Sequence, residues 1–216
     1  YDYAAEQIRS WDLVPNEEYD NLCNEFNPTA FDARKWARQA KEMGARYLIF
    51  TTKHHDGFCM WPSKYTDFTI ANSPYKKDIV KQVVDAYNRE GIDVILYFSI
   101  MDWHHPDYPH FEDAHHPMRN HPACGNEGRD FGRYLDYMHG QVRELCTNYG
   151  RLDVLWFDFS YGEGEKALRG EAWRAHELVT MVRELQPGIN IDNRLEVSGE
   201  GFGSMYEGDA KPWHGD

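Results

Sequence analysis

The densest cluster of ionisable side chains in this 216-residue sequence is the stretch TTKHHDGF, residues 51–58, which directly follows the apolar run YLIF. Neutral imidazole offers one hydrogen-bond donor and one acceptor, so the adjacent His54 and His55 are well suited to bind hydroxyl groups. As metal ligands they would need a further histidine or carboxylate, and the His-x-His spacing of metal-dependent barrels is absent. If the strand pleat continues through them, the two side chains diverge, whereas a bulge would turn both inward.

A second candidate is Asp158, which ends the apolar run VLWFD. An ionised carboxylate between bulky apolar residues is costly to bury unless it is paired or hydrogen-bonded. Asp158 is therefore either a structural carboxylate, bonded to a loop amide or to Arg194, or a nucleophile or base at the end of a strand. Arg194 follows Asp192 and Asn193 at the end of another short apolar segment. Its guanidinium could pair with Asp158 or bond a substrate hydroxyl.

The segment 102–124, DWHHPDYPHFEDAHHPMRNHPAC, carries many histidines without regular spacing. They are His104, His105, His110, His115, His116 and His121. Long loops on a functional face often bind substrate, and a solvated loop is the simpler alternative.

Alternating helices and strands would position these residues. The first helix is predicted to begin after the N-cap Asp32 and to stop at Gly44, where a C′ glycine belongs. The second begins at Asp78 and stops at Gly91. A third and a fourth helix follow, and each of the four is predicted to have one apolar face. The first face consists of Trp36, Ala37, Ala40 and Met43, and the second of Ile79, Val80, Val83, Val84 and Tyr87. The third consists of Phe131, Leu135, Met138, Val142 and Leu145, and the fourth of Trp173, Leu178, Val182 and Leu185.

Four apolar strands follow these helices, at 46–52, 92–99, 152–158 and 189–193. Their nearly continuous apolar character predicts a parallel sheet that is buried on both faces. The candidate residues follow the carboxyl ends of the strands, where (β/α) barrels carry their active sites, and no glycine-rich nucleotide motif follows any strand. We therefore predict an α/β fold, a (β/α) TIM-like barrel with about four βα units present. Because an open half-barrel leaves strand edges unpaired and inner faces uncovered, the other strands are expected to be missing or supplied by another copy.

Charge and composition narrow the class of partner. The net charge of −13 argues against a nucleic-acid partner. No apolar run approaches the roughly 18 residues of a membrane span, so we expect no membrane partner. The N-terminal residues do not have the pattern of a signal peptide. Because the chain has no initiator Met, this says little about the compartment of the protein. The oligomeric state and the compartment stay open.

Taken together, these motifs resemble the retaining α-L-fucosidase family of glycoside hydrolases. The resemblance covers most of residues 25–196 and rests on TTKHHDGF with the SKYTD that follows it, on LDVLWFDF and on NIDNR. It implies that Asp158 is the nucleophile and that Arg194 contacts the nucleophile region. It also implies that His54 and His55 hydrogen-bond sugar hydroxyls. Tyr97, Trp103, Trp156 and Arg194 complete the expected set of substrate-binding residues.

The implied activity is that of an exo-glycosidase cleaving terminal α-L-fucosyl residues from a glycan by double displacement, with no metal and no organic cofactor. Such a reaction needs two carboxyl groups about 5–5.5 Å apart. The family's acid/base glutamate is expected just beyond Asp216, with Glu207 and Glu200 as fallback candidates. The alternatives are a non-catalytic fucose-binding fragment or inactive homologue, and a metal-dependent barrel hydrolase.

Residues 1–216 are accordingly expected to form one partial catalytic barrel domain. The first strand, with the family's His-Trp-Gly motif, would precede Tyr1, and the C-terminal strands would follow the chain. We expect these 216 residues alone to be inactive because the acid/base is missing. Phe159 stands where the family usually has a glycine. The family is often secreted, periplasmic or lysosomal.

Overall fold

The computed structural model describes residues 8–11, 14–110, 113, 116–158 and 168–195. Its strands form one parallel sheet in the order β1-β2-β3-β4. The strands are β1 (Tyr47–Lys53), β2 (Asp93–Ser99), β3 (Val154–Asp158) and β4 (Asn190–Ile191). Sequential parallel strands joined by helical crossovers are the repeating unit of a (β/α) barrel. The predicted α/β class is confirmed, and the chain forms an incomplete barrel.

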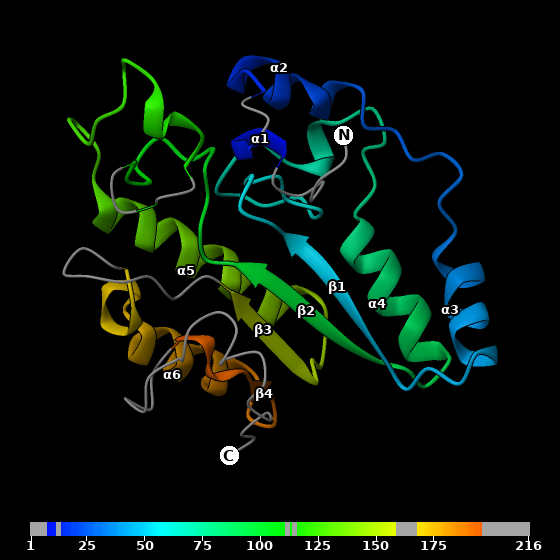
Figure 1. Cartoon of the computed structure of the whole chain (residues 1–216). Helices are drawn as coiled ribbons and strands as arrows, with labels where there is room; N and C mark the ends of the chain where they lie inside the picture. The colour runs from blue at the N-terminus through cyan, green and yellow to red at the C-terminus, as the bar shows by residue number, and fades with distance from the viewer. Residues whose placement is uncertain (1–7, 12–13, 111–112, 114–115, 159–167, 196–216) are drawn as a thin grey trace.

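The helices pack beside this sheet (Figure 1). They are α1 (Ile8–Trp11), α2 (Asn16–Asn21), α3 (Ala33–Glu42), α4 (Ile79–Arg89), α5 (Phe131–Asn148) and α6 (Ala175–Leu185). Short 3₁₀ helices are η2 (Leu22–Asn24), η3 (Ile70–Asn72), η4 (Pro117–Asn120), η5 (Gly170–Trp173) and η6 (Asn193–Leu195). The helices α4, α5 and α6 connect successive strands, and α3 packs on α4 as α5 packs on α6. None of the helices in the described ranges is long and apolar enough to cross a bilayer.

The predicted helix ends of α3 and α4 are confirmed. The Asp32 side chain accepts a hydrogen bond from the backbone N–H of Lys35 at 2.9 Å, and Asp78 caps α4 in the same way at 2.8 Å. Gly44 and Gly91 follow the two helices with φ of +83° and +68°, a backbone conformation that glycine adopts without steric cost.

Two helical predictions were wrong in detail. In α3, Trp36 is 52% exposed and Met43 is 85% exposed, because the buried face of that helix is the one with Ala33 and Ala37. Trp173 lies in η5 rather than in α6, because Arg174 has a φ of +51° and interrupts the helical path between them. Both differences come from packing and local backbone conformation that apolar spacing alone does not report.

The core lies between the sheet and its helices. In β2 and β3, Leu96 pairs with Leu155 and Phe98 with Phe157, and all four side chains are fully buried. Since side chains alternate along a strand, the residues between them face the opposite side of the sheet. That opposite face is the one on which Tyr97 and the candidate residue Asp158 lie.

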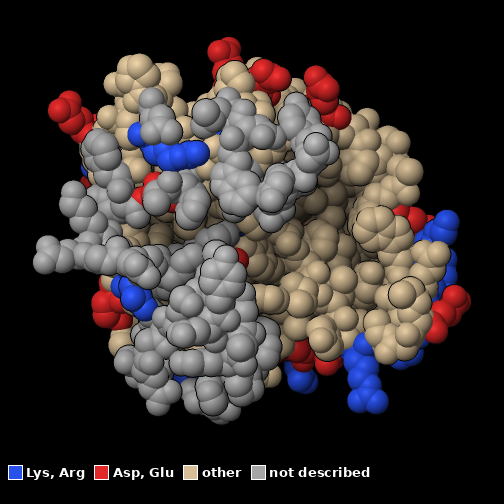
Figure 2. Space-filling view, in the orientation of Figure 1, with Lys and Arg blue, Asp and Glu red and all other residues tan. Residues whose placement is uncertain are grey.

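The expectation that every strand is buried on both faces was wrong for β1. Burial alternates along this strand, with Tyr47 61% and Ile49 41% exposed. The strand is at the end of the described sheet, so no further described strand pairs with its outer edge. Figure 2 shows the molecule hollowed near its centre, with most Lys, Arg, Asp and Glu side chains around the rim. An open inner face is the physical consequence of an incomplete barrel.

Candidate active site

The carboxyl ends of β1, β2 and β3 bring the candidate residues to one edge of the sheet. Ser99 pairs with Asp158 and Tyr97 pairs with Trp156 across β2 and β3. Tyr97 and Trp156 are therefore neighbours on the same face, with ring centroids 5.8 Å apart. The prediction that these strand ends share an edge is confirmed.

A local irregularity in β1 decides which way its polar residues point. Thr51 pairs with Tyr97 but Lys53 pairs with Phe98, so one extra residue is accommodated between them. Phe98 faces the helices, and Lys53 accordingly points there as well. The next residue, His54, is thereby set on the side of Tyr97. A bulge is therefore present, but it lies before the histidine pair, between Thr51 and Lys53.

Asp158 is buried and is held through both of its carboxylate oxygens. The Arg194 guanidinium forms an ion pair and hydrogen bond with Oδ1. The Tyr97 hydroxyl donates to Oδ2 at 2.6 Å. Arg194 also lies over the Trp156 ring, 5.5 Å from its centroid. The contact between Asp158 and Arg194 is one of the two that the sequence left open for Arg194, whereas the hydrogen bond from Tyr97 was not predicted.

His54 extends this network. Its Nε2 lies 3.2 Å from the Tyr97 hydroxyl oxygen, and the two rings are stacked with an interplanar angle of 11°. A tyrosine hydroxyl has only one proton, and Tyr97 donates it to Asp158. The Tyr97 oxygen must then accept from His54, which fixes the His54 tautomer with its proton on Nε2.

His55 contacts His54 but stacks on a different aromatic ring, that of Trp103 rather than Tyr97. The two imidazole rings meet edge to face at 4.1 Å, and His55 stacks on Trp103 at 3.8 Å. The Trp103 indole N–H donates to Asp113 at 2.6 Å, and its backbone N–H donates to the His55 carbonyl at 2.7 Å. Trp103 thus holds His55 in place through the ring stack and the backbone hydrogen bond. Asp113 had no sequence signal, because it lies in an aperiodic loop.

A buried ion pair fixes the turn that carries the two histidines. The Lys53 ammonium lies 3.2 Å from Asp102 and 3.1 Å from the Gln141 side-chain oxygen. Asp102 also accepts from the backbone N–H groups of His104 and His105, each at 3.0 Å. Burial raises the pKa of Asp102, but the attraction of Lys53 and the hydrogen bond from Tyr137 outweigh it, so the pKa is lowered overall.

Asp192 is a second carboxyl group near Asp158. Its Oδ1 accepts from the backbone N–H of Phe157 at 3.0 Å, which ties β4 to β3. Burial raises its pKa well above the usual range, and the negative charge of Asp158 acts in the same direction. From the sequence, Asp192 was predicted to lie at a strand end, but no role was predicted for it.

The fallback acid/base candidates and the metal-dependent alternative remain to be compared with the described residues. Glu200 and Glu207 lie outside them, as does Phe159. Among the described residues, no group of three or more His, Cys, Asp or Glu side chains could hold a metal ion. That result gives the metal-dependent alternative no support within this part of the chain.

A sequence model of the family described as alpha-L-fucosidase matches residues 2–211. The chain belongs to the α-L-fucosidase family. Alpha-L-fucosidase 1 of Arabidopsis thaliana is 32% identical over 170 residues, which cover 75% of this chain and 28% of the plant protein. The family resemblance inferred from the motifs is thereby confirmed.

Solved structures of fucosidases share the fold. Alpha-L-fucosidase isoenzyme 1 from Paenibacillus thiaminolyticus matches with a TM-score of 0.84 and 52% identity, over 88% of this chain and 44% of that one. A GH29 α-L-fucosidase from Bacteroides thetaiotaomicron, trapped as a covalent intermediate with 2-fluoro-fucosyl fluoride, matches with a TM-score of 0.76 and 44% identity, over 90% of this chain and 42% of that one. This chain therefore spans less than half the length of these relatives.

Proposed function

We propose that the protein to which this chain belongs is a retaining α-L-fucosidase and that Asp158 is its nucleophile. The observation that carries the proposal is the setting of Asp158, which ends β3 and is bonded by Arg194 at one oxygen and by Tyr97 at the other. Membership of the fucosidase family supports an α-L-fucosyl substrate. The covalent intermediate of the Bacteroides relative supports a double displacement.

In the first step, an Asp158 oxygen attacks the anomeric carbon of the fucosyl residue. The glycosidic carbon–oxygen bond breaks, and the leaving oxygen takes a proton from a second carboxyl group. In the second step, that carboxylate removes a proton from water, and the water oxygen replaces Asp158 at the anomeric carbon. Two inversions give net retention, and the free Asp158 carboxylate is restored.

The other residues orient the reactants. We assign His54 and His55 to hydrogen bonds with the sugar hydroxyls, because a neutral imidazole has one donor and one acceptor nitrogen. Since the Nε2 proton of His54 is directed at Tyr97, its Nδ1 would accept from a sugar hydroxyl. Trp156 offers an aromatic surface beside Asp158, and Arg194 and Tyr97 fix the direction of the carboxylate. Trp103 acts on the substrate through His55, on which its ring stacks.

The second carboxyl group is assigned to a glutamate outside the described residues. Glu207 is the fallback candidate, and a glutamate beyond Asp216 in the longer protein is the first candidate. A retaining glycosidase requires that this carboxyl group come within about 5.5 Å of Asp158. We expect the longer protein, rather than these 216 residues alone, to complete the pair.

Two measurements on the longer protein test the proposal. The first is hydrolysis of a nitrophenyl α-L-fucoside by the wild type and by Asp158→Asn, which keeps the size of the side chain but is not a nucleophile. The second is mass spectrometry after incubation with 2-fluoro-fucosyl fluoride, which should lose its anomeric fluoride and add one 2-fluoro-fucosyl group to the peptide containing Asp158. Equal turnover by Asp158→Asn, or an adduct on another peptide, would show that the nucleophile is a different residue. Fucose binding in a titration without any hydrolysis would favour the non-catalytic alternative.

A further inference from the structure

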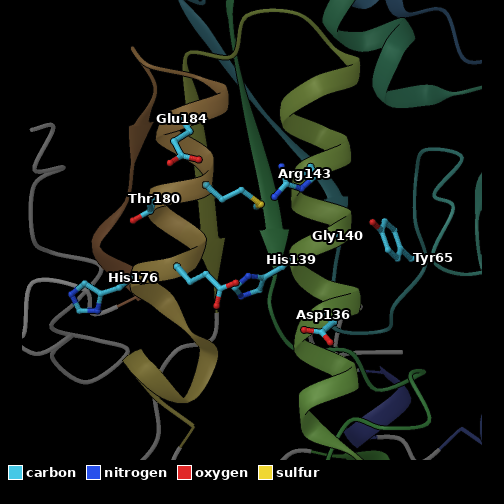
Figure 3. Close-up of a pocket in the computed structure, with 10 residues that line it drawn as sticks. Tyr65, Asp136, His139, Gly140, Arg143, His176, Thr180 and Glu184 are labelled. Carbon is cyan, nitrogen blue, oxygen red and sulfur yellow. The ribbon is translucent and has the colours of Figure 1, made fainter.

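A cavity of about 550 Å³ lies between α5 and α6, away from the strand ends that carry Asp158. Figure 3 shows His139 and Arg143 of α5 in the space between the two helices, with Tyr65 beside Gly140 of α5. Thr180 and Met181 of α6 complete the wall opposite. The volume is within the range of pockets that bind small molecules. We call this feature the α5–α6 groove.

The segment that carries Tyr65 is fastened to α5 through two carboxylate hydrogen bonds. Glu144 of α5 accepts from the indole N–H of Trp61 at 3.0 Å and from the backbone N–H of Lys64 at 2.8 Å. Gln141, also of α5, donates to the Ser63 hydroxyl at 3.4 Å. Although Tyr65 is 47% exposed, the chain on which it stands is therefore held in place.

Gly140 provides the space in which the Tyr65 ring lies. Glycine is an unfavourable residue in a helix interior, and Gly140 lies near the middle of the 18-residue α5 without a positive φ that would require it. A Cβ atom added at Gly140 would come within 2.2 Å of the Tyr65 Cζ. The close approach of the ring thus accounts for a glycine that helix propensity disfavours.

Three polar side chains of the groove, those of Arg143, Thr180 and Glu184, are available to a ligand, whereas His139 is bonded to the Trp173 carbonyl and Asp136 is paired with Arg174. Within the part of the chain that the structure describes, no hydrogen bond or ion pair engages the side chains of Arg143, Thr180 or Glu184. Together with the Tyr65 ring, they offer donors, acceptors and an aromatic surface, which is the combination that hydroxyl-rich ligands require. Asp136 is paired with Arg174, and the remaining carboxylates of the lining, Glu177 and Glu184, outnumber its one guanidinium, so the charge of the groove disfavours an anion.

We propose that the α5–α6 groove is a second carbohydrate site, which binds a neutral oligosaccharide against the Tyr65 ring. This second site rests on the proposed function in one respect: the choice of a fucosylated glycan as its ligand follows from the proposed substrate. The groove is separate from Asp158, so binding there and hydrolysis can be measured independently.

The test is an NMR titration of the ¹⁵N-labelled 216-residue chain with 2′-fucosyllactose. We expect saturable shifts at the amides of Tyr65 and Arg143 that persist in Asp158→Asn. Tyr65→Ala should weaken this binding about tenfold or more. Gly140→Ala should do the same, since it keeps every polar group and only displaces the ring. Tyr47→Ala removes another exposed tyrosine, on β1, and should leave the affinity unchanged.

The outcomes separate this proposal from the proposed function. Absence of saturable shifts in the groove, or equal affinity in wild type, Tyr65→Ala and Gly140→Ala, overturns the second site even where the longer protein hydrolyses fucosides. Tighter binding of a sulfated trisaccharide than of the neutral one overturns the ligand class. Groove binding without an adduct at Asp158 instead overturns the nucleophile assignment and leaves the second site intact.

Discussion

At the scale of single residues, the most informative group is the Tyr97 hydroxyl. Its single proton goes to Asp158, and its oxygen accepts from His54, so one hydroxyl joins the proposed nucleophile to the histidine pair. A sugar hydroxyl bonded by His54 would then be coupled to the orientation of Asp158 through two hydrogen bonds, of 3.2 and 2.6 Å. This gives Tyr97 a positioning role that its apolar surroundings in the sequence do not indicate.

We therefore predict that Tyr97→Phe in the longer protein lowers kcat/KM for a nitrophenyl α-L-fucoside by about 10- to 100-fold. A hydrogen bond to a charged group contributes about 1.5–3 kcal/mol, and about 1.4 kcal/mol corresponds to a factor of ten. The control is Tyr75→Phe, which removes the hydroxyl bonded to Gln82 at 3.2 Å and outside the site. Equal loss in both variants would mean that general destabilisation, rather than the contact with Asp158, causes the effect.

At the scale of elements, the turn after β1 determines where the two histidines stand. Gly57 has a φ of +88°, and a Cβ added there would lie 2.3 Å from an Asp102 carboxylate oxygen. The same carboxyl group is bonded to Lys53 and to two backbone N–H groups, so it has little freedom to move aside. The turn and the buried ion pair are therefore one structural unit.

Gly57→Ala should consequently destabilise the fold by more than Gly44→Ala, as measured by urea denaturation. Both glycines have a positive φ, of +88° and +83°, but no atom lies within 4 Å of a Cβ added at Gly44. The left-handed conformation itself costs a non-glycine residue about 1–2 kcal/mol, which both variants share. The difference between them isolates the clash of the added Cβ with Asp102 and with the His104 Cβ, which lies 2.9 Å away. Equal destabilisation of the two variants would mean that the turn relaxes without cost.

The loop after β2 contains a histidine that must stay neutral. His116 is buried, its ring is 4.4 Å from that of His110, and its Nδ1 accepts from the backbone N–H of Met118 at 3.0 Å. Burial, followed by the positive charges around it, lowers the pKa of His116 from 6.5 to about 3. Between these two values the unfolded chain binds a proton that the folded chain does not, so stability is lost as the pH falls below 6.5.

We predict that His116→Asn reduces the acid sensitivity of the fold. Asparagine keeps a side-chain acceptor for the Met118 N–H but does not titrate. Each proton taken up only on unfolding costs up to about 1.4 kcal/mol per pH unit, so the free energy of unfolding should fall more steeply in wild type than in the variant. Urea denaturation at about pH 7 and about pH 5 measures the two slopes. Parallel slopes would show that His116 is protonated in the folded state.

At the scale of the whole molecule, much of the architecture could be predicted from the sequence. Apolar runs bounded by polar residues marked the strands, and the rule that parallel strand ends share an edge predicted the meeting of Asp158 and Arg194. The position of the bulge before Lys53 could not be predicted, because an extra residue within a polar segment does not change any apolar pattern in the sequence. The support of His55 by Trp103 could not be predicted either, since an aperiodic loop does not reveal what its side chains contact.

The exposed inner face of β1 also depends on information beyond the strand itself. Tyr47 and Ile49 have the apolar character of buried residues, and whether they are covered depends on which other strands close the barrel. Among the described residues, no strand pairs with the outer edge of β1. We propose that further βα units of the longer protein cover this face.

We predict, as a consequence, that the 216-residue chain on its own associates with itself in a concentration-dependent way through β1. An unpaired strand edge is a template for pairing, and the exposed Tyr47 and Ile49 add apolar surface to it. The double variant Tyr47→Thr/Ile49→Thr keeps strand propensity while removing that surface. Burial of one such side chain contributes about 1.5–3 kcal/mol, so the dissociation constant from sedimentation velocity should rise about tenfold or more. Trp36→Thr is the matched control, because Trp36 is 52% exposed but lies on α3, outside the sheet. A monomer at every concentration, or an equal effect of Trp36→Thr, would show that the open sheet face does not drive association.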